Sequence, residues 1–225
     1  SLEAGRVAAL SFASALGQAP RVALLLPLLT PLFPLIARLM SEGRETEALG
    51  AFRRVAGLLG LVAMPMMLLM AIWSEDVTQV AFGRGRCGAE CVDQTAAPLT
   101  WYAFALWPAF LSMLVNRTLS AANRQGAILW TTAATVAITI VLDVILLGPM
   151  EQAGLALAAT IGVYANVAML LVLLRHHFPA VPLRSMGVRQ ARILAAAGAA
   201  AVAALLMDLV LPTGGRSTLA VAGLL

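Results

Sequence analysis

The sequence predicts an all-α protein: a polytopic bundle of transmembrane helices with about six spans. Of its 225 residues, 61% are hydrophobic and only 12% are charged, and the mean hydropathy is +0.90. These values lie far above the apolar share of an ordinary soluble domain. Several apolar stretches also reach the ~18 residues that a helix needs to cross a bilayer, and no soluble domain interrupts them.

The predicted spans follow one another with short polar turns between them. We expect them at Leu16–Met40, Val55–Trp73, Pro98–Ala121, Gly126–Leu147, Gln152–Leu174 and Ala191–Leu211. Only "GPME", residues 148–151, separates the fourth from the fifth, and this pattern is typical of a tight turn between helices. The final apolar run "STLAVAGLL" is too short to span, and there is no initiator methionine, so we expect a piece of a longer protein.

Arginines near the ends of the spans predict the orientation in the membrane. The turns after the first, third and fifth spans hold ten arginines, against five on the other face. They are Arg38, Arg44, Arg53, Arg54, Arg117, Arg124, Arg175, Arg184, Arg189 and Arg192. Basic residues are enriched on the cytoplasmic side, so these turns are predicted to face the cytoplasm.

The first span carries Pro20, Pro27, Pro31 and Pro34. A proline inside a helix removes a backbone hydrogen bond and clashes with the carbonyl four residues before it, at a cost of about 3 kcal/mol in water. In hydrocarbon, neighbouring helices, hydroxyl groups or cavity water must satisfy the freed groups. The last three prolines share one helical face, which favours a bent helix beside a water-filled cavity, as in transporters. The alternative is a static kink that helps packing.

A few polar residues lie inside the spans. Asp143 is one turn or so from the outer end of the fourth span, and Thr139, four residues earlier, shares its face. Because ionisable groups at membrane depth are costly, Asp143 is a candidate ligand for a hard cation or a proton, and an aspartate solvated at the outer interface is the alternative. For Asn116 and Asn166 we favour hydrogen bonds between helices.

Two cysteines, Cys87 and Cys91, fall in the loop after the second span, on the predicted outer side. An oxidising compartment would allow a disulfide between them, and two free thiols are an equal alternative. A zinc site needs more ligands than this loop offers, so no metal other than a coupling ion is expected.

Other function classes leave no signature in the sequence. The net charge of +4 is small for the length, and basic patches with interleaved aromatics are missing, which argues against nucleic-acid binding. We find no nucleophile paired with a base, no glycine-rich phosphate loop and no metal-ligand cluster, so the sequence argues against an enzyme.

Four segments, taken in order, resemble the MurJ/MviN family of lipid II flippases, within the superfamily that includes polysaccharide flippases and multidrug extruders. They are "EAGRVAALSFASALGQAP", "PLIARLMSEGRETEALGAFRRV", "VAFGRG" and "AGLALAATIGVYANVAMLLVLLR". The resemblance covers nearly the whole chain. It implies the second lobe of a two-lobe flippase over residues 1–174, incomplete at its N-terminus, then a basic cytoplasmic connector over 175–190 and additional C-terminal helices over 191–225, the last one truncated.

The resemblance also implies site residues. Cavity arginines of the family hold the diphosphate of the substrate, a task that suits the paired donors of guanidinium. The position of this lobe's arginine falls at Ala15, so Gln18 and Arg21 become the candidate substrate-binding residues. The sodium site of some members maps onto Thr139, Asp143 and Thr160, with Na⁺ or H⁺ as the coupling ion and no other cofactor.

We therefore expect a multi-pass protein of the bacterial inner membrane that translocates lipid II, a polyprenyl-diphosphate-linked peptidoglycan precursor, by alternating access. Its expected partners are this lipid-linked glycan, membrane lipids and the missing first lobe. Two alternatives stay open: an exporter of another lipid-linked polysaccharide unit or of small molecules, which the substitution at Ala15 makes worth testing, and a non-transporting membrane scaffold.

Overall fold

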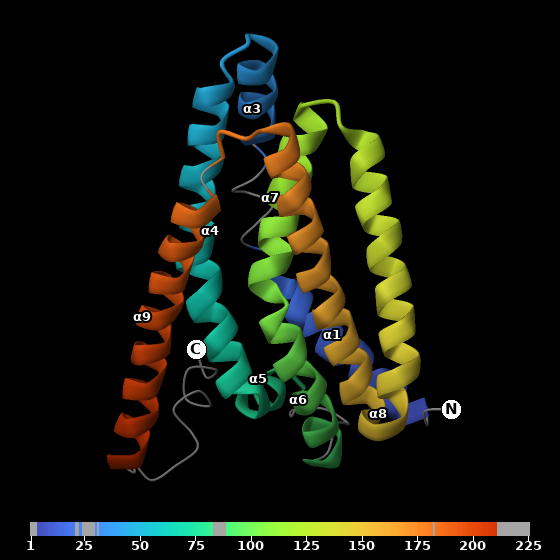
Figure 1. Cartoon of the computed structure of the whole chain (residues 1–225). Helices are drawn as coiled ribbons and strands as arrows, with labels where there is room; N and C mark the ends of the chain where they lie inside the picture. Colours follow the sequence, from blue (N-terminus) through green and yellow to red (C-terminus); the bar gives the residue numbers. More distant parts are fainter. Residues whose placement is uncertain are drawn as a thin grey trace.

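The computed structural model describes residues 4–20, 23, 30, 32–82, 89–181 and 183–210, and no strand occurs among them. The helices are α1 (Ala4–Pro20), α3 (Leu32–Ser41), α4 (Glu45–Ile72), α5 (Ser74–Phe82), α6 (Ala89–Phe104), α7 (Leu106–Ala121), α8 (Gln125–His177) and α9 (Leu183–Val210). They form an elongated bundle (Figure 1). The predicted all-α fold class is confirmed.

Four helical segments of the described chain are long and apolar enough to cross a membrane, and a fifth is possible if α6 and α7 form one bent span. These segments cover the second to sixth predicted spans. For the first predicted span, α1 and α3 account for the two ends, and most of the residues between them, Pro27 and Pro31 included, lie outside the described part of the chain. The explanation of the prolines by a bent, cavity-lining helix therefore stays a prediction.

The helix α8 is a hairpin with two arms of membrane length, Gln125–Leu147 and Ala153–His177. The chain reverses direction between them, at the turn predicted from "GPME" (Figure 1). Two contacts join the arms: Asn166 Nδ2 donates a hydrogen bond to Thr135 Oγ1 over 2.8 Å, and the Thr139 side chain lies against the bare Cα of Gly162. The interhelical hydrogen bond predicted for Asn166 is confirmed.

Asn116 differs from Asn166 in its surroundings. Its Oδ1 atom is buried with no hydrogen-bond partner among the described residues. The bond between helices that we expected there is not present in this part of the structure.

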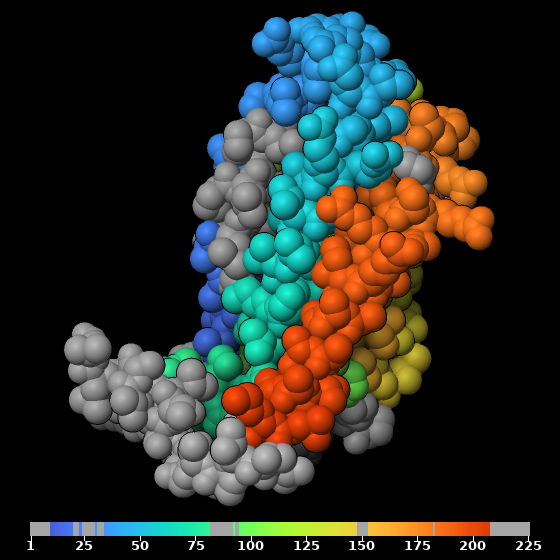
Figure 2. All heavy atoms as spheres, turned by 90° about the vertical axis from the view of Figure 1, so that its left-hand side faces the viewer, coloured from blue at the N-terminus to red at the C-terminus, as the bar shows by residue number. Residues whose placement is uncertain are grey.

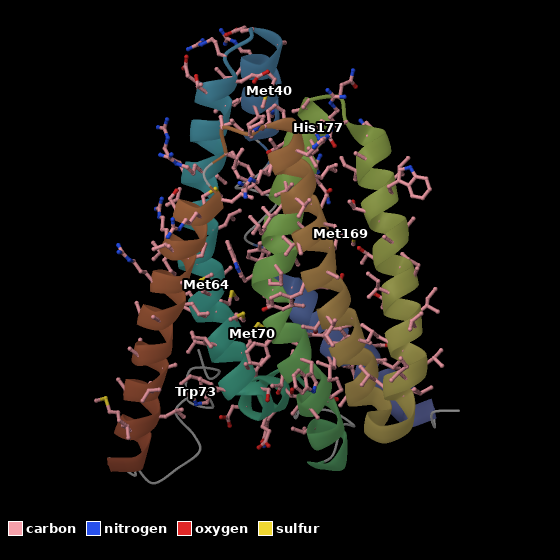
Figure 3. The ribbon with its side chains drawn as sticks, in the orientation of Figure 1. Met40, Met64, Met70, Trp73, Met169 and His177 are labelled. Carbon is pink, nitrogen blue, oxygen red and sulfur yellow. The ribbon has the colours of Figure 1, made fainter. Side chains whose placement is uncertain are left out.

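The three arginine-rich turns lie at the same end of the bundle (Figure 1). Met40 and His177 mark this end and Trp73 the opposite one (Figure 3). At the turn from α3 to α4, Arg38 and Arg44 both bind Glu42, at 2.7 and 3.0 Å. These hydrogen bonds hold the pKa of Glu42 below its ordinary value, and the bond from Arg38 has the largest effect. The three arginine-rich turns follow alternate spans, and turns that follow alternate spans must lie on the same side of a membrane.

The helix α9 packs along α4 (Figure 2). It begins at Leu183, so the second half of the predicted connector, residues 183–190, is already helical. Arginine favours helices and can keep its charged head at the membrane surface, which allows a helix to start before its apolar part. The contact is close because Gly57 and Gly60 of α4 lack side chains where Arg189 and Gln190 approach, and Gln190 Nε2 donates to the Ala56 carbonyl over 2.9 Å.

Candidate functional site

A cavity of about 240 Å³ opens between α1, the junction of α6 with α7, and the second arm of α8. Its lining residues are Ser14, Gly17, Gln18, Tyr102, Ala105, Leu106, Ala109, Ala159 and Val163. Most of the wall is made of small or apolar side chains, and Ser14, Gln18 and Tyr102 supply the polar groups. Such a combination, apolar walls with a few placed polar groups, is typical of a small-molecule site.

The walls of the cavity follow from local sequence. Gly17 brings α1 against α6, because a Cβ added at Gly17 would lie only 3.0 Å from Tyr102 Cβ. The other side is formed where α6 and α7 meet at an angle of 44° around Ala105. Ser14 Oγ donates to the Ser11 carbonyl over 3.1 Å, so its proton is directed back to its own helix.

The two candidate substrate-binding residues have different outcomes. Gln18 is exposed and lines the cavity. Arg21 lies outside the described residues, so its role stays a prediction. Ala15, the position where the family resemblance places an arginine, is an exposed residue of α1.

The predicted ion ligands lie on both arms of the α8 hairpin. Thr139 and Asp143, four residues apart on the first arm, are both half-buried. A carboxylate and a hydroxyl one turn apart on one helical face are oxygen donors of the kind that hard cations prefer.

Thr160, on the second arm, has a different environment. It is buried at 4% exposure, and its Oγ1 donates to the Trp101 carbonyl of α6 and to the Ala156 carbonyl of its own helix, each over 2.8 Å. Gly162, which faces Thr139, is two residues away and therefore on another side of the helix. The Thr160 hydroxyl therefore bonds α6, and its place in one ion site with Thr139 and Asp143 stays a prediction.

Thr139, Asp143 and Thr160 carry oxygen donors, which are the ligands that a hard cation prefers. Thr139 and Asp143 would contribute a hydroxyl and a carboxylate oxygen, and the lone pairs of a hydroxyl that donates its proton, as Thr160 does, remain available. Sodium coupling stays a prediction.

The cysteine prediction lies at the edge of the described chain. Cys87 is outside the described residues, and only the helical backbone of Cys91, in α6, is described. The disulfide stays a prediction.

Sequence reasoning missed Tyr164 and Tyr102. Tyr164 OH donates to the Phe104 carbonyl over 3.2 Å, beside the bend that borders the cavity. Two signals for Tyr164 were available in the sequence. It lies four residues after Thr160, and Pro108 deprives the Phe104 carbonyl of its helical donor. The sequence did not show, however, that the second arm of α8 packs beside the α6–α7 junction. Tyr102 is visible only through the packing that places it against Gly17 in the wall of the cavity.

Several membrane-length helices in one chain are those of a multi-pass membrane protein. The family model described as "Lipid II flippase MurJ" matches residues 1–223 of this chain. The chain therefore belongs to the MurJ family of lipid II flippases. This agrees with the expectation that the protein is not an enzyme.

A solved structure supports the fold. The chain is similar to "Lipid II flippase MurJ, inward closed conformation", with a TM-score of 0.66 and 16% identity, over 93% of this chain and 49% of that one. The chain thus spans about half the length of this solved flippase. The comparison with curated proteins found no match.

Proposed function

We propose that this chain is one lobe of a flippase that moves lipid II, a polyprenyl-diphosphate-linked peptidoglycan precursor, across the bacterial inner membrane by alternating access, coupled to Na⁺ or H⁺. The observation that carries the proposal is the match of the lipid II flippase family over residues 1–223. The other half of such a transporter would come from the first lobe, since the solved flippase is about twice as long.

The cavity supports a transport role. A diphosphate headgroup must cross the hydrocarbon in a polar environment, because charge at the bilayer centre is strongly disfavoured. The cavity brings Gln18 of α1 together with Tyr102 of α6. Gln18 can donate to phosphate oxygens, and Arg21, three residues later, is the proposed cationic partner for the diphosphate.

The proposed coupling site is the pair Thr139 and Asp143, with Thr160 as a third oxygen. Thr139 and Asp143 lie one turn apart on the first arm of α8, and Thr160 is on the second arm, whose Ala159 and Val163 line the cavity. An ion bound across the two arms would therefore act on an arm that shapes the cavity.

Complementation tests the proposal. The native lipid II flippase is depleted from a bacterium, and the full-length parent of this chain is supplied as wild type, as Arg21→Glu or as Asp143→Asn. The matched control for Asp143 is Val144→Asn, one residue away and 76% exposed on the outer surface of the hairpin. We expect rescue by wild type and by the control, and loss of rescue with both site variants.

The alternatives predict other outcomes. A well-expressed parent that fails to rescue, but exports another lipid-linked polysaccharide, would favour the second substrate class, which the alanine at position 15 makes worth testing. Rescue that survives Arg21→Glu and Asp143→Asn together would favour a non-transporting scaffold.

A further inference from the structure

The junction of α6 and α7 leaves two backbone carbonyls without their helical donors. Pro108 has no N–H, so the Phe104 carbonyl, four residues earlier, cannot accept the usual i+4 helical bond. Ala105 N donates to the Tyr102 carbonyl over 3.1 Å instead of reaching Trp101. The helices meet here at 44°.

Both carbonyls accept hydrogen bonds from one helix, the second arm of α8. Thr160 Oγ1 donates to the Trp101 carbonyl over 2.8 Å, and Tyr164 OH donates to the Phe104 carbonyl over 3.2 Å. Thr160 and Tyr164 are four residues apart and therefore share a helical face. Side chains of neighbouring helices that satisfy the freed groups allow a broken helix at membrane depth.

The same junction forms one wall of the cavity. Tyr102, Ala105, Leu106 and Ala109 line it from the bent segment, and Ala159 and Val163 line it from the arm that carries the two donors. The angle at the junction and its distance from α8 therefore set the shape of the cavity around Gln18.

We propose that Tyr164, together with Thr160, is a positioning residue: its hydroxyl holds the α6–α7 bend against α8 and so keeps the cavity in the shape seen here. Tyr164 does not line the cavity, and its action passes through the Phe104 carbonyl. The consequence for transport rests on the proposed function, whereas the hold on the bend does not.

Because the Phe104 carbonyl lacks its helical donor at Pro108, two variants can test the role of the Tyr164 hydroxyl. Tyr164→Phe removes one hydroxyl and keeps the ring. Pro108→Ala restores an N–H that can bond the Phe104 carbonyl within the helix. If the Tyr164 hydroxyl acts by replacing this bond, its removal matters in the wild-type background and not beside Pro108→Ala.

The measurement is backbone hydrogen–deuterium exchange of peptides covering residues 102–109, in the full-length protein in lipid nanodiscs. Removal of one hydrogen bond between membrane helices predicts about threefold faster exchange for Tyr164→Phe. Thr160→Val should do the same, and Thr160→Ser should match wild type. The control is Thr132→Val, because Thr132 Oγ1 bonds only the Ile128 carbonyl of its own helix, and exchange at 102–109 should not change.

Unchanged exchange in Tyr164→Phe would overturn the proposal. So would an equal increase in the Pro108→Ala background, since it would show that the tyrosine acts through packing. Transport measured in the same variants separates the two proposals: a parent protein that never flips lipid II refutes the proposed function, while exchange at 102–109 still decides the role of Tyr164.

Discussion

Gly162→Ala tests what holds the two arms of the α8 hairpin together. A Cβ at this position would collide with the Thr139 hydroxyl, whose oxygen lies well inside contact distance, while Thr139 Cβ at 3.5 Å and Thr135 Cγ2 at 3.9 Å would be ordinary neighbours. Threonine is branched at Cβ and populates only two rotamers in a helix, so relief of this contact needs a rotamer change or a shift of the arm. We expect a loss of about 1–3 kcal/mol, the usual range for overpacking.

The hydrogen bond between the same arms should contribute less. Asn166→Leu removes the bond to Thr135 Oγ1, and Thr135 still donates to the Thr131 carbonyl over 2.8 Å. Such interhelical bonds average about 0.6 kcal/mol. The structure therefore predicts that Gly162→Ala is the more damaging of the two changes.

The assay is the free energy of unfolding of the full-length protein in detergent, by steric trapping. Gly198→Ala is the matched control, since nothing lies within 4 Å of a Cβ there, and alanine should be neutral or stabilising in a helix. Thr139→Ala should rescue Gly162→Ala, because the nearest atom would then be at ordinary contact distance. The reasoning is refuted if Gly162→Ala is as harmless as Gly198→Ala, or if Thr139→Ala leaves the loss undiminished.

Two further predictions concern the turn between α3 and α4. Gly43 has a φ of +72° and no atom within 4 Å of a Cβ, so Gly43→Ala should cost about 1–2 kcal/mol through backbone strain alone and Gly43→Asn less. Gly126→Ala is the control for the same assay, and equal stability of the two alanine variants would contradict this. Because the pKa of Glu42 is lowered by Arg38 and Arg44, its ion pairs are present above the ordinary glutamate pKa of about 4.3 and are lost as the pH falls through the lowered value. Exchange protection of residues 41–45, corrected for intrinsic rates, should therefore decrease as the pH falls through the lowered pKa of Glu42, and a Glu42→Gln variant should not show this decrease.

The number and order of membrane helices could be predicted from the sequence because both depend on local composition. Apolar length fixes α4, both arms of α8 and α9, and "GPME" fixes the reversal of the hairpin. The bond of Asn166 to the neighbouring arm also follows from local rules, since a polar side chain deep in a span needs a partner. The identity of that partner, Thr135, required the packing of the two arms.

The site was less accessible to sequence reasoning, and the prolines show why. Pro65 lies inside α4 and Pro98 inside α6, without a break in either helix, whereas the described chain bends next to Pro108. A proline creates the same local deficit each time. Whether the helix breaks there depends on donors from elsewhere, in this case Thr160 and Tyr164, which stand more than fifty residues from their acceptors.

The family resemblance implies that Thr160 is an ion ligand, and its hydrogen bond to α6 gives it a second role at the bend. Its single hydroxyl proton is shared between the Trp101 and Ala156 carbonyls, and the oxygen lone pairs can still bind a cation. Loss of transport in Thr160→Val therefore cannot distinguish an ion ligand from a residue that holds the bend. Asp143→Asn does distinguish them, because no hydrogen bond of Asp143 supports the junction among the described residues. If Asp143 binds the coupling ion, this variant should abolish transport driven by sodium or by protons and leave exchange at residues 102–109 at the wild-type rate. Faster exchange there would instead mean that Asp143 acts on the bend.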